Sequence, residues 1–183
     1  MSTICLLSSS ESLTVLVAAR IVERGHSVID GQHASLVPGD ESGLLQPAHA
    51  RALVNLLRPL VAADADVIVA GDRLVDILIG HRIADELQVP FASIANADGV
   101  VVVVGDISAA RRGACLVCVR LDEASAVDEF TAACEELAVE ARGCVAAVDG
   151  RPEPDNRVIS IIRLTDHVTA AAQCVVCAGA AAE

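Results

Sequence analysis

The chain lacks lysine, tryptophan and tyrosine, and it has only two phenylalanines among its 183 residues. All 13 basic side chains are therefore arginines, and 25 acidic side chains bring the formal net charge to −12 at pH 7. An acidic surface repels the phosphates of nucleic acids, and the scarcity of aromatic rings removes the usual platforms for base stacking. We therefore expect no nucleic-acid partner.

Long hydrophobic runs and a targeting segment are also missing. Apolar stretches such as Val100–Val104 are far shorter than the roughly 20 residues of a membrane-spanning helix, and no basic segment precedes an apolar one at the N-terminus. The cysteines number seven, and four of them lie in apolar or helical stretches: Cys115, Cys118, Cys134 and Cys144. We expect no membrane association, no signal peptide, and buried, reduced thiols in a cytoplasmic protein.

Aliphatic residues are abundant, and their spacing predicts an α/β fold. Hydrophobic residues make up 54% of the chain, enough for the core of a single domain over residues 1–183. The first predicted helix begins at a capping box formed by Ser8 and Glu11 and ends at Gly25. Further helices are predicted over Pro47–Ala62, Leu74–Leu87 and Ala124–Arg142. The predicted strands are Ser27–Asp30, Asp66–Gly71, Pro90–Ala95, Val100–Val104, Cys115–Leu121, Gly143–Val148 and Val158–Leu164. Residues Gly31–Gly43 are predicted as a loop and Thr165–Glu183 as a C-terminal tail. This alternation favours a mostly parallel central sheet flanked by helices.

Ligands of such sheets bind beyond the carboxyl ends of the strands. The loops after Val69, Ala95 and Leu121 are therefore the places to look for chemistry. The last of these loops opens with two acids, Asp122 and Glu123, before a predicted helix.

A strand that ends in paired acids before a turn and a long helix resembles the type I phosphoribosyltransferases. Further segments resemble the orotate phosphoribosyltransferase branch, in order along nearly the whole chain: Arg20–His26, Asp30–Ser35, Asp66–Gly71, Ala84–Phe91, Ile161–Asp166 and Gln173–Gly179. The last segment is similar to a Cys-x-x-Cys tail of some members. The resemblance implies a phosphoribosyltransferase fold, a homodimer or larger homo-oligomer, and a role in pyrimidine nucleotide metabolism.

The resemblance also implies a reaction, in which a pyrimidine-like base such as orotate displaces Mg²⁺-bound pyrophosphate from phosphoribosyl pyrophosphate. Asp122 and Glu123 would hold the ribose hydroxyls, and Arg73 would hold the pyrophosphate. Ser125 and Asp72 complete the candidate ligand-binding set.

The sequence departs from this family's pattern where phosphate should bind. Ala126–Glu129 has neither the glycine nor the threonine of a phosphate-binding nest, and it adds two carboxylates that repel a phosphate dianion. Phe91–Gly99 has no cation, and Gln32 stands where the family often has lysine. These departures predict a catalytically degenerate homologue without catalytic residues or cofactor, acting as a binding, regulatory or assembly protein, with itself or another subunit. An active transferase with Mg²⁺ and a sensor of an uncharged base or nucleoside remain alternatives.

Two Cys-x-x-Cys pairs raise the question of zinc. Cys115 and Cys118 lie in a predicted strand, where residues three apart point to opposite faces. Cys174 and Cys177 lie in the predicted tail. We expect no metal site at either pair.

Overall fold

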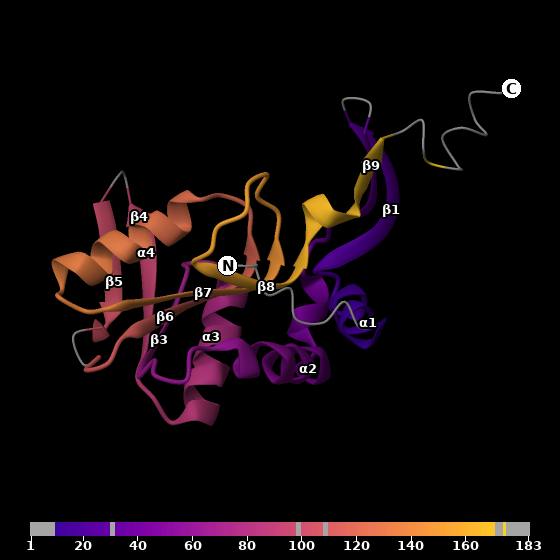
Figure 1. Cartoon of the computed structure of the whole chain (residues 1–183). Coiled ribbons are helices and arrows are strands. Elements are labelled where there is room, and N and C mark those ends of the chain that lie inside the picture. The colour runs from indigo at the N-terminus through magenta and orange to yellow at the C-terminus, as the bar shows by residue number, and fades with distance from the viewer. Residues whose placement is uncertain (1–9, 30–31, 98–99, 108–109, 171–173, 175–183) are drawn as a thin grey trace, which may run out of the picture.

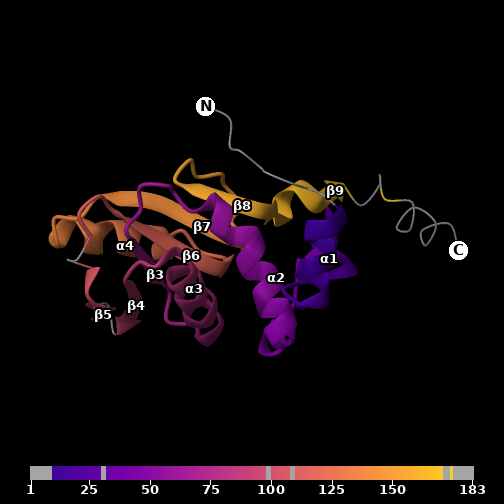
Figure 2. The ribbon, with the colours of Figure 1, turned by 90° about the horizontal axis from the view of Figure 1, so that it is seen from below.

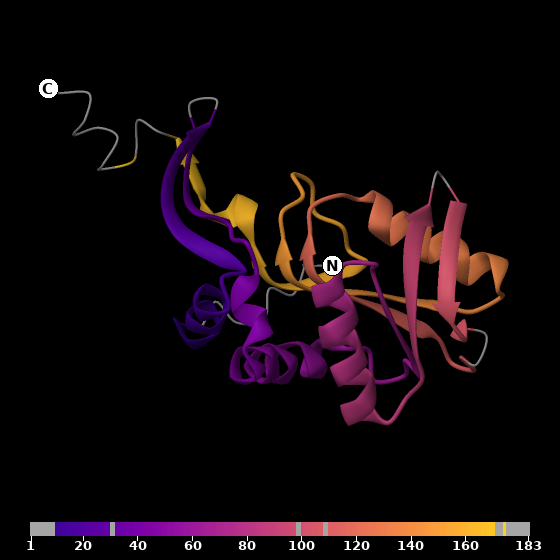
Figure 3. The same ribbon diagram turned by 180° about the vertical axis from the view of Figure 1, so that it is seen from behind.

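The computed structural model describes residues 10–29, 32–97, 100–107, 110–170 and 174. Two sheets organise these residues, a six-stranded sheet with the order β5-β4-β3-β6-β7-β8 and a three-stranded sheet with the order β1-β2-β9. The small sheet lies at the opposite end of the molecule from β5 (Figure 1 and Figure 3). No helix of the described part of the chain is long and apolar enough to cross a membrane.

The six-stranded sheet is parallel except at one edge. Its strands are β3 (Val67–Ala70), β4 (Phe91–Ala97), β5 (Val100–Gly105), β6 (Ala114–Leu121), β7 (Ala141–Asp149) and β8 (Val158–Arg163). The pairs β3–β4, β3–β6, β6–β7 and β7–β8 are parallel, and only β4–β5 is antiparallel. The α/β class and the mostly parallel sheet predicted from the sequence are confirmed.

Helices cover both faces of this sheet, so its central strands are buried on both sides. The helices are α1 (Ser10–Ala18), α2 (Pro47–Leu57), α3 (Leu74–Leu87) and α4 (Ser125–Glu136). α1, α2 and α3 lie side by side (Figure 2). Successive residues of β3 alternate between two cores. Ile68 belongs to the core under α2 and α3, whereas Val69 belongs to the core under α4.

The predicted helices in the middle of the chain are confirmed. α3 has the predicted bounds, and α2 starts at Pro47 as expected. Pro59 follows the end of α2 in a short 3-10 turn, η2 (Arg58–Leu60), because a proline in the helix interior removes a backbone hydrogen bond. The predicted strands between Asp66 and Leu121 are confirmed within a few residues.

The prediction for the first 45 residues was wrong in two places. The first helix ends at Ala18, and Gly25 lies inside strand β1 (Val22–Ile29), near a register shift between Arg24 and Ser27. The predicted loop Gly31–Gly43 contains strand β2 (Gln32–Pro38), which pairs with β1 before the short 3-10 helix η1 (Ser42–Leu45). β2 is buried only at Leu36 and is otherwise half-buried or exposed, so it lacks the apolar alternation that predicts a strand. Ser8 of the predicted capping box lies outside the described residues.

Two further boundaries differ from the prediction. The helix predicted over Ala124–Arg142 ends at Glu136, because Ala138 adopts a left-handed φ of 54° and β7 begins at Ala141. The predicted tail begins with a 3-10 turn, η4 (Leu164–His167), and strand β9 (Val168–Ala170), which pairs with β2. Of the Cys174–Cys177 pair, only Cys174 is among the described residues, and its side chain is buried.

Candidate functional site

The candidate site lies where β3 and β6 end beside each other. From this point α3 leads to one face of the sheet and α4 to the other, which makes it the switch point where ligands of open α/β sheets bind. The structure brings the predicted residues together here. Asp72, Glu123 and Ser125 line one cavity of about 310 Å³, and Arg73 lies within electrostatic reach of Asp122.

This small cavity is polar and acidic at its mouth. Asn96 Nδ2 donates to Glu129 Oε1 at 2.6 Å, and Ser125 Oγ donates to Glu123 Oε2 at 3.3 Å. Its inner wall is formed by Ile94, Leu116 and Cys118. Among the described residues, the lining of this cavity contains no basic side chain that would neutralise a phosphate.

Only three residues, Asp122 to Ala124, separate the end of β6 from the start of α4. The N–H groups of Val127 and Asp128 both donate to the Ala124 carbonyl, at 3.1 and 3.2 Å. These two bonds are the first hydrogen bonds of helix α4 itself. The Asp128 carboxylate accepts a hydrogen bond from Arg157 Nη2 at 2.8 Å.

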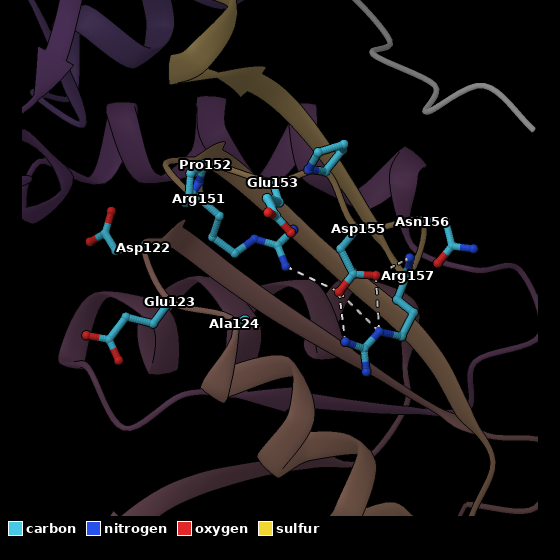
Figure 4. A pocket seen from close by; sticks show the side chains of 10 residues that line it. Asp122, Glu123, Ala124, Arg151, Pro152, Glu153, Asp155, Asn156 and Arg157 are labelled. Carbon is cyan, nitrogen blue, oxygen red and sulfur yellow. Dashed lines mark hydrogen bonds and ion pairs between the residues drawn. The ribbon is translucent and has the colours of Figure 1, made fainter.

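A larger cavity of about 760 Å³ lies between residues 122–124 and the segment 151–157, which connects β7 to β8. Figure 4 shows Asp155 between two arginines of that segment. Arg157 donates to both oxygens of Asp155 and Arg151 Nη1 to one of them. The hydrogen bonds from Arg157 lower the pKa of Asp155 to about 2, so this carboxylate stays charged.

Four arginines stand at the carboxyl ends of four different parallel strands. Arg73 follows β3, Arg120 lies near the end of β6, Arg151 follows β7, and Arg163 ends β8. A carboxylate of the same chain faces each of them, and these partners are Glu41, Asp122, Asp149 and Asp155.

The Asp149–Arg151 pair is the most buried of these contacts. The residues are 2% and 3% exposed, and two parallel hydrogen bonds of 2.9 and 3.0 Å join the guanidinium to both carboxylate oxygens. The hydrogen bonds that Arg151 donates to Asp149 raise the pKa of Arg151 against the opposing effect of burial. Arg163 Nε lies 3.6 Å from the same carboxylate.

Asp76 is a buried carboxyl group beside Arg73, in the first turn of α3. Burial raises its pKa to about 6, although the Val119 N–H, at 2.6 Å, and the charge of Arg73 act in the opposite direction. Glu41 and Asp72 raise it further. This end of the sheet therefore holds several negative charges close together.

Comparison with known proteins agrees with this architecture. No protein-family model and no curated protein sequence matches the chain. Among solved structures, the orotate phosphoribosyltransferase from Aeropyrum pernix is similar, with a TM-score of 0.59 at 16% identity over 84% of this chain and 93% of that chain. The enzyme of the same name from Francisella tularensis has a TM-score of 0.60 at 12% identity, over 82% and 84%. The adenine phosphoribosyltransferase from Rhodothermus marinus has a TM-score of 0.58 at 12% identity, over 84% and 99%.

The chain has the type I phosphoribosyltransferase fold. The resemblance recognised in the sequence is thereby confirmed at the level of the fold. Identities this low say nothing of the reaction, so function has to be argued from the residues of this chain.

Among the described residues, no group of three or more His, Cys, Asp or Glu side chains is placed to hold a metal ion. Cys115 and Cys118 point into different cores, on opposite faces of β6, as the strand period predicts.

Sequence reasoning missed the partners of the arginines. It named Arg73 and Asp122 but not Glu41, Arg120 or Asp149. A signal was present for the last two, because each lies at the end of a predicted strand, where site residues gather. Glu41 gave no such signal, since it was placed inside a predicted loop.

Proposed function

We propose that this protein uses the phosphoribosyltransferase fold without phosphoribosyl transfer, as a cytoplasmic binding or assembly protein that associates with a second copy of itself or with another subunit. The observation that carries the proposal is the state of the four strand-end arginines. Phosphate recognition needs guanidinium groups free to face the ligand. Here carboxylates of the same chain accept hydrogen bonds from Arg73, Arg120 and Arg151. Arg163 Nε lies 3.6 Å from Asp149 and has no hydrogen-bond partner among the described residues.

The backbone around the site supports the same conclusion. The three residues between β6 and α4, Asp122 to Ala124, include no glycine that would let the backbone take the left-handed conformations of a phosphate nest. Only Asp98 and Gly99 connect β4 to β5, which pair up to Ala97 and Val100. Two residues leave no length for a cationic loop that would close over a departing diphosphate.

The residues also fit Mg²⁺ poorly. This ion binds carboxylates in near-ideal octahedral geometry and keeps several waters. Asp122 accepts a hydrogen bond of 2.7 Å from Arg120 Nε, and Glu123 accepts one from Ser125. A carboxylate held by a guanidinium has fewer lone pairs and less net charge to offer a cation.

Calorimetric titration of the purified protein with phosphoribosyl pyrophosphate and Mg²⁺ tests the proposal, with light scattering on the same sample. We expect no binding at millimolar ligand and a stable oligomer. Micromolar binding would overturn the proposal and favour an active transferase. In that event Asp122→Asn should weaken binding, whereas Glu153→Gln, on the opposite wall of the larger cavity, should not.

Uridine and orotic acid belong in the same series of titrations. The larger cavity has room for a base or nucleoside, so a ligand sensor without chemistry is the second candidate. Saturable binding of either compound without turnover would favour the sensor over an assembly protein.

A further inference from the structure

A buried glutamate, Glu41, lies between arginines from two strands of the central sheet. It follows β2 at the start of η1, and its side chain is 6% exposed. Its φ of 60° places the backbone in the left-handed region, which is uncommon for a residue other than glycine. The Glu41 N–H donates to the Arg20 carbonyl at 2.9 Å. Such a conformation persists where the surroundings fix it, and strained residues of this kind gather at functional sites.

The Glu41 carboxylate bridges the carboxyl ends of β3 and β6. Arg73 Nη2 donates to Glu41 Oε2, and Arg120 Nη1 lies 3.5 Å from Glu41 Oε1. Arg120 Nη1 donates to the Gly39 carbonyl at 3.0 Å, in the same turn as Glu41. Within the described part of the chain, Glu41 Oε1 is buried and has no hydrogen-bond partner. One of the two carboxylate oxygens is therefore held by charge alone.

Two guanidinium groups that converge at a switch point form an anion site. Their preferred ligands are carboxylates and phosphates, and here the anion belongs to the protein. We propose that Glu41 is an internal anion that occupies the Arg73–Arg120 site and keeps diphosphate ligands out of it. The proposal deepens the proposed function, on which it rests, by naming the residue that closes the site.

The ionisation of Arg73 agrees with this assignment. Burial would lower its pKa, but the hydrogen bond to Glu41 and the charges of Asp76, Glu41 and Asp122 outweigh burial and raise it. The guanidinium is therefore always charged, and a half-buried charge needs a counter-ion. Removing the Glu41 charge takes away the carboxylate that accepts the hydrogen bond of Arg73, so this donor can then face an external anion, with Asp76 and Asp122 as the remaining neighbouring charges.

The experiment is a calorimetric titration with inorganic diphosphate, without metal, of the wild type, Glu41→Gln and Asp40→Asn. Asp40 is the matched control, because its substitution removes one charge from the same turn. Its exposed carboxylate faces Arg20 at 3.2 Å and Ser42, and makes no contact with the two site arginines. We expect Glu41→Gln to bind diphosphate at least tenfold more tightly than the wild type, and Asp40→Asn to match the wild type. The double variant Glu41→Gln/Arg120→Gln should bind diphosphate no more tightly than the wild type does.

A folded Glu41→Gln protein that binds diphosphate no better than Asp40→Asn would overturn the proposal. If Glu41→Gln fails to fold, the wild type still tests the proposal, because the NMR signals of the Arg73 and Arg120 side-chain N–H groups can be followed on addition of diphosphate. Signals that stay in place on addition of diphosphate support the proposal, and signals that shift in a saturable way overturn it. The two proposals fail differently. Binding of phosphoribosyl pyrophosphate by the wild type contradicts the proposed function, whereas the absence of any gain in Glu41→Gln contradicts the role of Glu41 alone.

Discussion

Asp76 shows how strongly single residues at the carboxyl edge are perturbed. Its carboxyl group is buried, and its pKa rises from the ordinary 3.8 to about 6. The folded protein therefore binds this proton more tightly than the unfolded chain does. Stability contributed by the protonated form is present below pH 4 and is lost as the pH rises through 6. At roughly 1.4 kcal/mol for each tenfold change in proton affinity, the cost of the charged form is about 3 kcal/mol.

Replacing Asp76 by asparagine removes this charge and keeps an oxygen to accept the Val119 N–H. We expect Asp76→Asn to raise the free energy of unfolding at pH 7.5 by about 1–3 kcal/mol. The difference from the wild type should shrink as the pH falls through 6 toward 4. Urea unfolding at several pH values measures it. Asp85→Asn, at an exposed position of the same helix, is the control. A difference in unfolding free energy between Asp76→Asn and the wild type that did not change with pH would contradict the argument.

The arginine–carboxylate pairs at this edge bear more on specificity than on stability. A buried pair such as Asp149–Arg151 gives up the hydration of two charges, and its mutual attraction only roughly offsets that loss. Well-packed apolar residues at these positions would stabilise the core equally well. The pairs matter because they fix which guanidinium groups can face a ligand, and at this edge each one already faces a carboxylate.

At the scale of the element, the turn between β2 and η1 places Glu41, and Gly39 makes the turn possible. Its N–H donates to the Ile21 carbonyl at 2.9 Å, and a Cβ at this position would lie 2.0 Å from the Arg20 carbonyl oxygen. We expect Gly39→Ala to lower the free energy of unfolding by about 1–3 kcal/mol, as other overpacked sites do. Chemical denaturation measures the loss. Gly25→Ala is the matched control, since its Cβ would meet only the Val37 side chain, at 3.4 Å, and an equal loss there would contradict the steric argument.

The elements that the sequence predicted well are those whose burial follows a simple period. β3 is apolar throughout and β6 is apolar except for Arg120, because both faces are covered, and α3 is bounded by Gly71 and Pro90. β2 escaped prediction because Leu36 is its only buried residue, and because one of its two partners, β9, is far away in sequence. Such pairing is tertiary information that no local pattern carries.

The same division holds for the candidate site. Asp72, Arg73, Asp122, Glu123 and Ser125 were predictable because strand ends meet at one edge of a parallel sheet. The partner of Arg73 was not, because Glu41 reaches it from a turn 32 residues away in sequence. Two hydrogen bonds to the turn after α1 hold Glu41 there, and local propensity says nothing of them.

At the scale of the whole molecule, charge and apolar surface predict where two copies meet. Copies with a net charge of −12 repel each other, and repulsion is least where the surface is uncharged. β5 is an outer strand of five valines and a final glycine, and Val100, Val102 and Val104 expose 63%, 41% and 63% of their surface on one face. An edge of this kind favours pairing with another chain. A twofold axis through it would place the same strand of a second copy opposite.

We therefore expect the wild type to form a dimer through β5, and Val102→Lys to shift it toward the monomer, because a lysine on an edge strand opposes pairing. Leu137→Lys is the matched control, since Leu137 is 40% exposed but lies at the end of α4. Light scattering over a range of protein concentrations measures both variants against the wild type. A dimer that survives Val102→Lys but dissociates in Leu137→Lys would place the interface at the end of α4. A wild type that is monomeric throughout would remove self-association from the proposed function and leave a different protein subunit as the partner.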